Sequence, residues 1–436
     1  MSKKFILILL DGLGDRSFGR LERKTPLQAA HTPFLDYLAG QGCSGLYHAS
    51  CLGQALPSEN AHFAMFGYDL CEFPGRGALE ALGAGIELDR DEVAVLTHFV
   101  NVSLENGRLR LIQDKVQAGP HEAGKAFSEV AGFETNGLNI RLVQVKGLFG
   151  VILLKGGASP YITDSNPVLD GNLLSAIQPL KSHANDPASV NTARALKKYL
   201  CLAYGRLSRA GFNVARQKAG KPALNALVTQ RPGRLGDPVP FAVKNGLKGL
   251  TISSGVVYQG LGAYLGLVVK HAAEFDDPGR EIKDRVSMAG TCLEDYDFIH
   301  VHSKAPDEAA HQKDPLLKKK AIESLDQGLS EALPLLLERE DVVVAVTADH
   351  STPSGGPLVH SGEPVPLLIA GPGVRVDHVD KFDEISAACG GLGCVRGKEF
   401  MYLVLNYLER SKLVGLMDTP VDQPYWPGNP EPFTLE

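Results

Sequence analysis

The 436-residue chain has no long hydrophobic run near its start and no regular pattern of cysteines. The apolar segment FILILL covers only residues 5–10 and meets Asp11 at once, so we expect a β-strand there rather than a signal peptide or a membrane span. The seven cysteines are an odd number, and the one close pair, Cys389 and Cys394, has no second pair to complete a zinc site. These absences indicate a reduced, cytoplasmic protein without a disulfide framework or a membrane anchor.

The chain also lacks a surplus of positive charge. Its 44 lysines and arginines are outnumbered by 50 aspartates and glutamates, which gives a formal net charge of −6. Such a surface has no overall attraction for nucleic acid or for an anionic membrane, so an anionic substrate has to be held by a local site. The length exceeds what one small hydrophobic core needs and predicts two domains.

Apolar, β-branched segments alternate with helical patterns in two parts of the chain. We expect strands near residues 5–10, 296–303, 341–350 and 365–371, and helices near residues 32–42, 74–88 and 316–338. Apolar strands that alternate with helices are typical of a mostly parallel sheet with helices on both faces. The sequence therefore predicts an α/β domain built from both ends of the chain.

The pattern changes between these two parts. Strands near 138–156 are followed by a turn-rich segment at 159–172 and a helix near 191–212. This arrangement predicts a smaller inserted α+β domain. We expect residues 1–107 and 236–436 to form the catalytic domain and residues 108–235 to form the insert.

The residues that follow the expected strands of the large domain are almost all potential metal ligands. Open parallel sheets bind ligands beyond the carboxyl ends of their strands. Four segments contribute three aspartates and three histidines there: Asp11, Asp307, His311, Asp349, His350 and His360. Alone, each could be a turn aspartate or a hydrogen-bonded histidine. Together they predict a pair of transition-metal ions, with manganese, zinc and iron all compatible.

Ser58, in the segment PSENAHFAMFG, is the candidate nucleophile. Its sequence context predicts the N-cap of a helix, and the N-terminus of a helix favours a phosphate. A serine hydroxyl is a weak nucleophile unless a base or a metal ion activates it, and the predicted metal pair supplies the second route. His62 lies one helical turn after Ser58 and has either an orienting or a packing role. These features predict a phosphoserine intermediate.

Several segments together carry a family resemblance, namely LLDGLGD, PSENAHFAMFGYD, GRGALEALGAGIEL, PDEAAH, TADHSTP and HSGEPVPLLI. The chain resembles the cofactor-independent (2,3-bisphosphoglycerate-independent) phosphoglycerate mutases of the archaeal type, in the alkaline phosphatase superfamily. The resemblance implies an alkaline-phosphatase-like fold. It also implies an enzyme that passes a phosphate from the 3-position of glycerate to a serine and back to the 2-position.

The resemblance also implies roles for individual residues. One of two divalent ions, manganese in many family members, would bind Asp307, His311 and His360. The other ion would bind Asp11, Ser58, Asp349 and His350. A small phosphorylated substrate would bind the insert, where Arg231 and Arg234 are the candidate anion-binding residues. Arg76, which we expect in the catalytic domain, has either a structural or a phosphate-binding role.

The chain departs from the family pattern in ways that leave other functions open. Leu148 and Phe149 stand where the family has a histidine and an arginine, and Asn166 and Val168 replace two polar residues of the insert. Each lost charge-assisted contact weakens substrate binding by about 1.5–3 kcal/mol. The alternatives are another phosphotransferase, for example one that resembles a homoserine kinase, a phosphomonoesterase, and a relative without catalytic activity.

Overall fold

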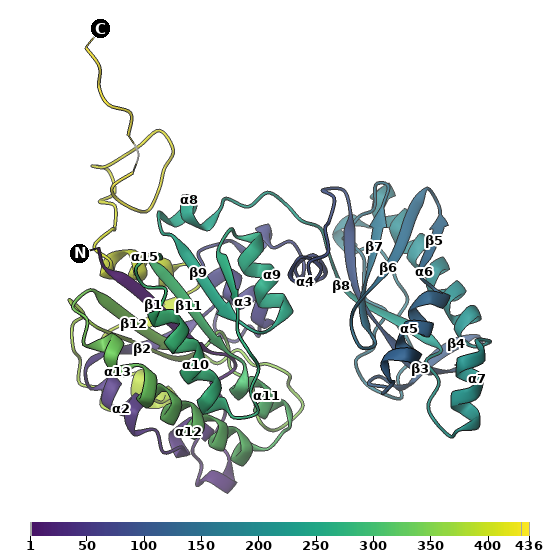
Figure 1. The fold of residues 1–436 in the computed structure, drawn as a ribbon, viewed down its shortest axis with the longest axis horizontal. Coiled ribbons are helices and arrows are strands. Elements are labelled where there is room, and N and C mark those ends of the chain that lie inside the picture. The colour runs from purple at the N-terminus through teal and green to yellow at the C-terminus, as the bar shows by residue number, and fades with distance from the viewer. Residues whose placement is uncertain (1, 429, 436) are drawn as a thin grey trace. The chain divides into compact units, whose positions relative to one another are not determined.

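The computed structural model of the protein describes residues 2–428 and 430–435 and divides the chain into two compact units (Figure 1). Unit 1 consists of Met1–Phe73 and Pro238–Glu436, and unit 2 of Pro74–Asp237. The expected insert, residues 108–235, therefore begins too late. The reason is β3 (Val93–Glu105), which pairs with strands of unit 2. The sequence of an apolar strand does not show which sheet the strand will join.

Unit 1 contains an eight-stranded sheet with strands in the order β10-β9-β11-β1-β12-β13-β2-β14. Their bounds are Val268–His271, Gly249–Ser253, Phe298–Ser303, Lys4–Leu10, Val342–Thr347, Val365–Ala370, Gly42–His48 and Gly393–Arg396. Only β13 runs antiparallel to its neighbours, and the other pairs are parallel. Strands β11, β12 and β13 are buried along their whole length, so both faces of the sheet are covered. The predicted α/β architecture is confirmed.

Helices surround this sheet, and α10 (Pro278–Gly290) packs against both β11 and α12 (Pro315–Ala332) (Figure 1). The helix expected over residues 316–338 is interrupted at Pro334, which begins the short helix α13 (Pro334–Leu337), because proline cannot donate within a helix. The remaining helices are α1 (Pro26–Ala29), α2 (Pro33–Ala39), α3 (Ser58–Met65), α8 (Phe241–Asn245), α9 (Val256–Tyr264), α11 (Ala305–His311), α14 (Glu384–Ala387) and α15 (Glu399–Tyr407). No helix in the described ranges is long and apolar enough to cross a membrane.

Unit 2 is an antiparallel sheet with helices, as expected for an α+β insert. Its strand order is β4-β3-β7-β6-β5, with β8 paired to β3. The other strands are β4 (Arg108–Gln113), β5 (Gly132–Thr135), β6 (Leu138–Lys146), β7 (Phe149–Lys155) and β8 (Ala226–Gly233). The helices are α4 (Arg76–Gly83), α5 (Pro120–Glu129), α6 (Pro187–Leu207) and α7 (Gly211–Lys218).

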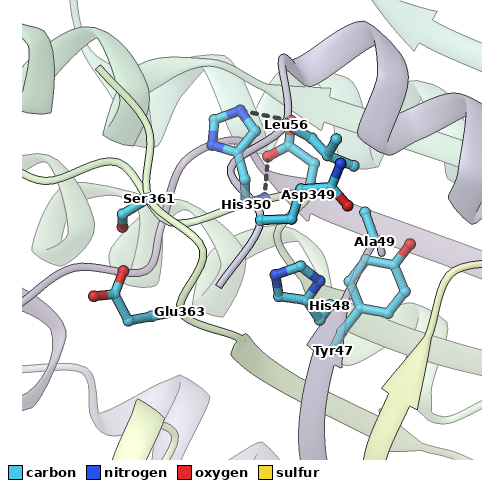
Figure 2. Close-up of a pocket in the computed structure, with 9 residues that line it drawn as sticks. Tyr47, His48, Ala49, Leu56, Asp349, His350, Ser361 and Glu363 are labelled. Carbon is cyan, nitrogen blue, oxygen red and sulfur yellow. Dashed lines mark hydrogen bonds and ion pairs between the residues drawn. The ribbon is translucent and has the colours of Figure 1, made fainter. Parts of the chain in front are cut away.

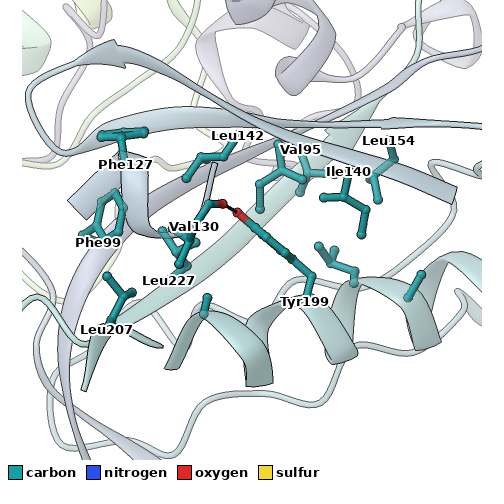
Figure 3. Close-up of a cluster of buried hydrophobic side chains, with 14 of the residues drawn as sticks. Val95, Phe99, Phe127, Val130, Ile140, Leu142, Leu154, Tyr199, Leu207 and Leu227 are labelled. Carbon is teal, nitrogen blue, oxygen red and sulfur yellow. Dashed lines mark hydrogen bonds between the residues drawn. The ribbon is translucent and has the colours of Figure 1, made fainter. Parts of the chain in front are cut away.

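The core of unit 2 forms between this sheet and α6 (Figure 3). The helix buries Leu196, Tyr199, Ala203 and Leu207, whose spacing of three or four residues places them on one face. The hydroxyl of Tyr199 donates to the main-chain oxygen of Val130 at 2.6 Å, so its one polar group is satisfied inside the core.

Candidate metal centre

The predicted metal ligands of unit 1 gather at the carboxyl ends of three neighbouring parallel strands. Leu10 at the end of β1 pairs with Ser303 at the end of β11, and Leu9 pairs with Thr347 at the end of β12. The residues that follow these strands therefore meet at one edge of the sheet. Two clusters have ligand atoms within 4.8 Å of one another: Asp11 with Asp349 and His350, and Asp307 with His350 and His360.

Gly12 allows the loop after β1 to pass through this crowded edge. Its φ is +66°, and a Cβ atom there would lie 2.6 Å from Oγ1 of Thr352 and 2.8 Å from Cβ of Asp307. A side chain would thus be both strained and in collision. The main-chain nitrogen of Gly12 donates to Oδ1 of Asp349 at 3.1 Å, which fixes that carboxylate.

The buried carboxylates of the first cluster are incompletely satisfied by the protein alone. Oδ1 of Asp11 and Oδ2 of Asp349 are buried and have no hydrogen-bond partner in the described part of the chain. Burial of an uncompensated charge is costly. These atoms and the clustered donors fit a divalent cation, because its positive charge would offset both the burial and the mutual repulsion of the carboxylates.

The protonation states at this edge follow from burial and from neighbouring charges. Burial raises the pKa of Asp11 well above its usual range, and Asp349 and Asp307 add to the rise. Burial acts in the same direction on Asp349, but His350 and His62 hold the pKa of that carboxyl below its usual range. Burial lowers the pKa of His350 to about 4. His350 is therefore neutral near pH 7, the form in which imidazole binds a metal.

His360 and His311 lie beside Asp307. Nε2 of His360 is 3.6 Å from Oδ1 of Asp307, and its Nδ1 is 2.8 Å from the main-chain oxygen of Leu56. A hydrogen bond from Nδ1 leaves the lone pair of Nε2 available for a metal. Nε2 of His311 is 3.2 Å from the same oxygen of Asp307, four residues earlier on α11. The two side chains therefore lie on one face of α11, although His311 itself belongs to neither close cluster.

Ser58 is the first residue of α3, and Pro57 occupies the N-cap. The expectation that Ser58 is the N-cap of this helix is therefore wrong. Its Oγ lies 2.9 Å from Nε2 of His350, the residue common to both clusters.

His62 contacts the same centre. It is fully buried, and its Nδ1 is 2.8 Å from the main-chain oxygen of Ser58 and 3.4 Å from Oδ2 of Asp349. Because these two contacts join the start of α3 to the loop after β12, His62 has more than a packing role.

Two further residues of the centre were missed by the sequence reasoning. The hydroxyl of Tyr258 donates to Oδ2 of Asp11 at 2.5 Å, and Nε2 of His302 lies 3.1 Å from the same oxygen. His300 and His302 alternate in the strand segment IHVHS, so both point to one face, and this pattern could have revealed His302. Tyr258 lies on α9, in an otherwise apolar segment that carries no comparable signal.

A small cavity adjoins the centre (Figure 2). Its volume is about 10 Å³, which is room for a single water molecule. Its lining includes Tyr47, His48, Asp349, His350, Ser361 and Glu363. The cavity is too small for a phosphorylated sugar acid.

The three arginines proposed for substrate binding all belong to unit 2. The side chain of Arg76 donates to Glu80 one turn later at 2.5 Å. Arg231 has a φ of +52° and donates its main-chain nitrogen to Asp164. The main-chain nitrogen of Arg234 donates to the oxygen of Pro74. Their role in substrate binding stays a prediction.

The departures from the family pattern are visible in unit 2. Phe149 is 53% exposed, with its ring 5.2 Å from that of His98. Asn166 bonds to Gln230 and accepts from the main-chain nitrogen of Val168, whose side chain is exposed. These residues present neutral side chains at the positions where the resemblance leads us to expect charged or polar ones.

Two carboxylate–histidine clusters and a neighbouring serine at the carboxyl edge of an α/β sheet are the donor set that a metalloenzyme uses to activate a serine. A model of the metalloenzyme superfamily matches residues 3–407. The 2,3-bisphosphoglycerate-independent phosphoglycerate mutase 2 of Methanocaldococcus jannaschii is 36% identical over 438 residues, 99% of each chain. The corresponding mutase of Pyrococcus furiosus is 35% identical over 95% of this chain and 99% of its own.

Solved structures agree with the sequence comparison. A protein from Pyrococcus horikoshii superposes with a TM-score of 0.77 at 31% identity, over 95% of this chain and all of its own. The cofactor-independent phosphoglycerate mutase of Thermoplasma acidophilum gives a TM-score of 0.63 at 28% identity, over 93% of this chain and all of its own. The chain belongs to the metalloenzyme superfamily and, within it, to the 2,3-bisphosphoglycerate-independent phosphoglycerate mutase family. The resemblance drawn from the sequence motifs is confirmed.

Proposed function

We propose that the protein interconverts 3-phosphoglycerate and 2-phosphoglycerate through a phosphoserine at Ser58. The observation that carries the proposal is the 2.9 Å contact between Oγ of Ser58 and His350, the residue common to both metal-ligand clusters. The relatives from M. jannaschii and P. furiosus are named for this reaction and match this chain over nearly its full length, which supports the same substrate here.

The hydrogen-bond network supports one tautomer of His350. Oγ1 of Thr352 donates to Asp307 at 2.9 Å, so at 3.1 Å it accepts from Nδ1 of His350. Nε2 of His350 then carries a lone pair and accepts a hydrogen bond from the hydroxyl of Ser58. When an ion is bound, this lone pair would serve the ion instead. The serine oxygen is thereby held beside the two clusters with its lone pairs free for a phosphorus atom.

We assign Asp11, Ser58, Asp349 and His350 to one divalent ion, and Asp307, His311 and His360 to the other. Manganese is the first candidate, and zinc and iron suit the same donors. When bound, such ions stabilise a serine alkoxide and neutralise phosphate oxygens.

The reaction consists of two phosphoryl transfers, which together amount to an isomerisation of phosphoglycerate. In the first, the bond between phosphorus and O3 of glycerate breaks, a bond to Oγ of Ser58 forms, and the serine proton passes to O3. In the second, O2 of the same glycerate attacks the phosphoserine and its proton returns to Ser58. No bisphosphoglycerate is needed, because the serine stores the phosphoryl group. We propose that Arg76, Arg231 and Arg234 of unit 2 provide anion-binding groups for the substrate.

The departures in unit 2 support a second candidate function. Phe149 exposes an apolar ring where a family arginine is expected, and an apolar group cannot hold a carboxylate. With a weak site for glycerate, the phosphoserine would pass its phosphate to water or to another acceptor. The protein would then be a phosphomonoesterase or a different phosphotransferase, for example one acting on homoserine.

Phosphorus NMR of the manganese-loaded protein with 3-phosphoglycerate distinguishes these functions. A new 2-phosphoglycerate resonance that is absent with the Ser58→Ala protein is the expected result. Inorganic phosphate alone would identify a phosphomonoesterase. A phosphate ester that forms only after homoserine is added would identify the other phosphotransferase. An unchanged spectrum in all samples would contradict catalysis and favour a relative without activity.

A further inference from the structure

Lys318 is a fully buried lysine in the first turn of α12. It is the first of three consecutive lysines in the segment LLKKKAIE, and the other two are partly or fully exposed. Lysine is almost never fully buried unless its charge is paired. The interior position of Lys318 therefore requires a specific set of partners.

The ammonium group of Lys318 has three acceptors. It donates to the main-chain oxygen of Gly14 at 2.8 Å and to that of Thr352 at 2.8 Å, and it lies 3.2 Å from Oδ2 of Asp15. An ammonium group has three N–H donors, so each donor has one partner. Gly14 and Asp15 belong to the loop after β1, and Thr352 belongs to the loop after β12.

These two loops carry the metal ligands. Asp11 stands three residues before Gly14, and Asp349 and His350 stand just before Thr352. The loops also bond directly to each other, because the main-chain nitrogen of Thr352 donates to the oxygen of Gly14 at 2.9 Å. Lys318, which lies on α12, donates to a main-chain oxygen of each loop at this junction.

Thr352 connects this junction to the ligands themselves. Its Oγ1 donates to Oδ1 of Asp307 at 2.9 Å and lies 3.1 Å from Nδ1 of His350. A shift of the Thr352 main chain would therefore move the group that orients both a carboxylate and an imidazole of the second cluster. Asp15 is itself fixed by the main-chain nitrogen and the hydroxyl of Ser354, at 3.0 and 2.6 Å.

We propose that Lys318 is a positioning residue of the metal centre: its ammonium group sets the spacing between the loop that bears Asp11 and the loop that bears Asp349 and His350. The inference rests on the proposed function, because it assumes that these clusters hold the ions. Lys318 touches no ligand atom. It acts through the main-chain oxygens of Gly14 and Thr352.

The test is a manganese titration, with free Mn²⁺ followed by its EPR signal, on the wild type, Lys318→Met and Lys319→Met. Methionine keeps the length of the side chain and removes the donors. We expect Lys318→Met to weaken manganese binding about 10–100-fold, the usual effect of losing a group that orients metal ligands. Lys319 pairs with Glu323 at the partly exposed side of the same helix, so Lys319→Met should bind manganese as the wild type does.

A double variant distinguishes bridging from simple charge pairing and remains available if Lys318→Met does not fold. Lys318→Met with Asp15→Asn removes both charges, which proteins tolerate better than the loss of one partner of a buried pair. If Lys318 bridges the loops, manganese binding stays weak in the double variant. Wild-type manganese affinity in the double variant would overturn the proposal, because it would mean that Lys318 only neutralises Asp15.

Kinetics separate this inference from the proposed function. With Lys318→Met at saturating manganese, kcat should fall while KM for 3-phosphoglycerate stays the same, since unit 2 is unchanged. A wild type that binds manganese without forming 2-phosphoglycerate would contradict the proposed function and leave the titration of Lys318→Met meaningful. A Lys318→Met protein with wild-type manganese affinity would contradict only the role of Lys318.

Discussion

The carboxyl edge of the unit 1 sheet and the main core of unit 2 bury different kinds of side chain. At the carboxyl edge of its sheet, unit 1 encloses Asp11, Asp349 and Lys318, each exposed by 1% or less. The main core of unit 2 consists of aliphatic and aromatic side chains such as Val95, Phe99 and Leu227 (Figure 3). Apolar burial stabilises a fold, whereas a buried charge costs several kcal/mol before its partners compensate.

This difference indicates where chemistry and where stability reside. Unit 1 keeps charges that a purely structural interior would replace by apolar groups, and it keeps them next to the donors of a metal site. Departures from the usual rules of packing are expected at functional sites. Substitutions of the proposed ligands at this edge of unit 1 should therefore change chemistry, and substitutions in the core of unit 2 should change stability.

The largest effect is expected for Ser58→Ala in unit 1. Without the nucleophile no phosphoserine forms, and kcat should fall on the order of 10⁴-fold or more. Rapid acid quenching after incubation with ³²P-labelled 3-phosphoglycerate measures the phosphoenzyme. Ser50→Ala is the matched control, because the hydroxyl of Ser50 donates to the nearby Gln54 and not to a proposed metal ligand among the described residues. Labelled phosphoenzyme in the Ser58→Ala protein would mean that another residue accepts the phosphate.

Phe99→Ala tests the other half of the comparison. Phe99 is 1% exposed and packs edge to face against Phe127 at 4.9 Å in unit 2. Its removal should lower the free energy of unfolding by about 3–5 kcal/mol, as measured by chemical denaturation. Manganese affinity should stay at the wild-type value. A parallel loss of manganese binding would show that the two units are not energetically separate.

The sequence predicts those residues of the centre that closely follow a strand along the chain. Asp11 and Asp349 could be assigned because each directly follows an apolar strand, and parallel strands end at one edge. Tyr258 and Lys318 could not, because each reaches the centre from a helix distant in sequence and nothing in its own segment distinguishes it from a packing or surface residue. The predicted position of the N-cap, Ser58, was wrong by one residue, because Pro57 also suits the start of a helix.

Glu384 in unit 1 provides a pH-dependent test. Burial raises the pKa of Glu384 to about 7, although bonds from Thr25 and the main-chain nitrogen of Asp15 oppose the shift. Because this folded-state pKa lies above the ordinary value of 4.5, the contribution of the group to stability is complete below about pH 4.5 and is lost as the pH rises through 7.

The loss should amount to roughly 3 kcal/mol at most, from 1.36 kcal/mol per unit of pKa shift. Glu384→Gln cannot ionise, so its free energy of unfolding should change less between pH 5 and pH 8 than that of the wild type. Denaturant unfolding at both pH values measures this difference. The same pH dependence in both proteins would contradict the assignment to Glu384.

The smallest effect is expected when the same substitution, tyrosine to phenylalanine, is made in each unit. The hydroxyl of Tyr199 in unit 2 donates to the oxygen of Val130, and the hydroxyl of Tyr68 in unit 1 donates to that of Val239, at 2.6 and 2.7 Å. Tyr199→Phe and Tyr68→Phe each remove one such bond and leave a carbonyl unpaired, so each should cost about 1 kcal/mol. Amide hydrogen exchange, read by segment, should show the loss of protection in the unit that carries the substitution.

Because neither hydroxyl contacts a metal ligand, manganese affinity should be the same in both variants. A loss of affinity in Tyr68→Phe alone would mean that even ordinary buried hydrogen bonds of unit 1 are coupled to its metal centre, and the contrast between the two interiors would then extend beyond the ligands themselves.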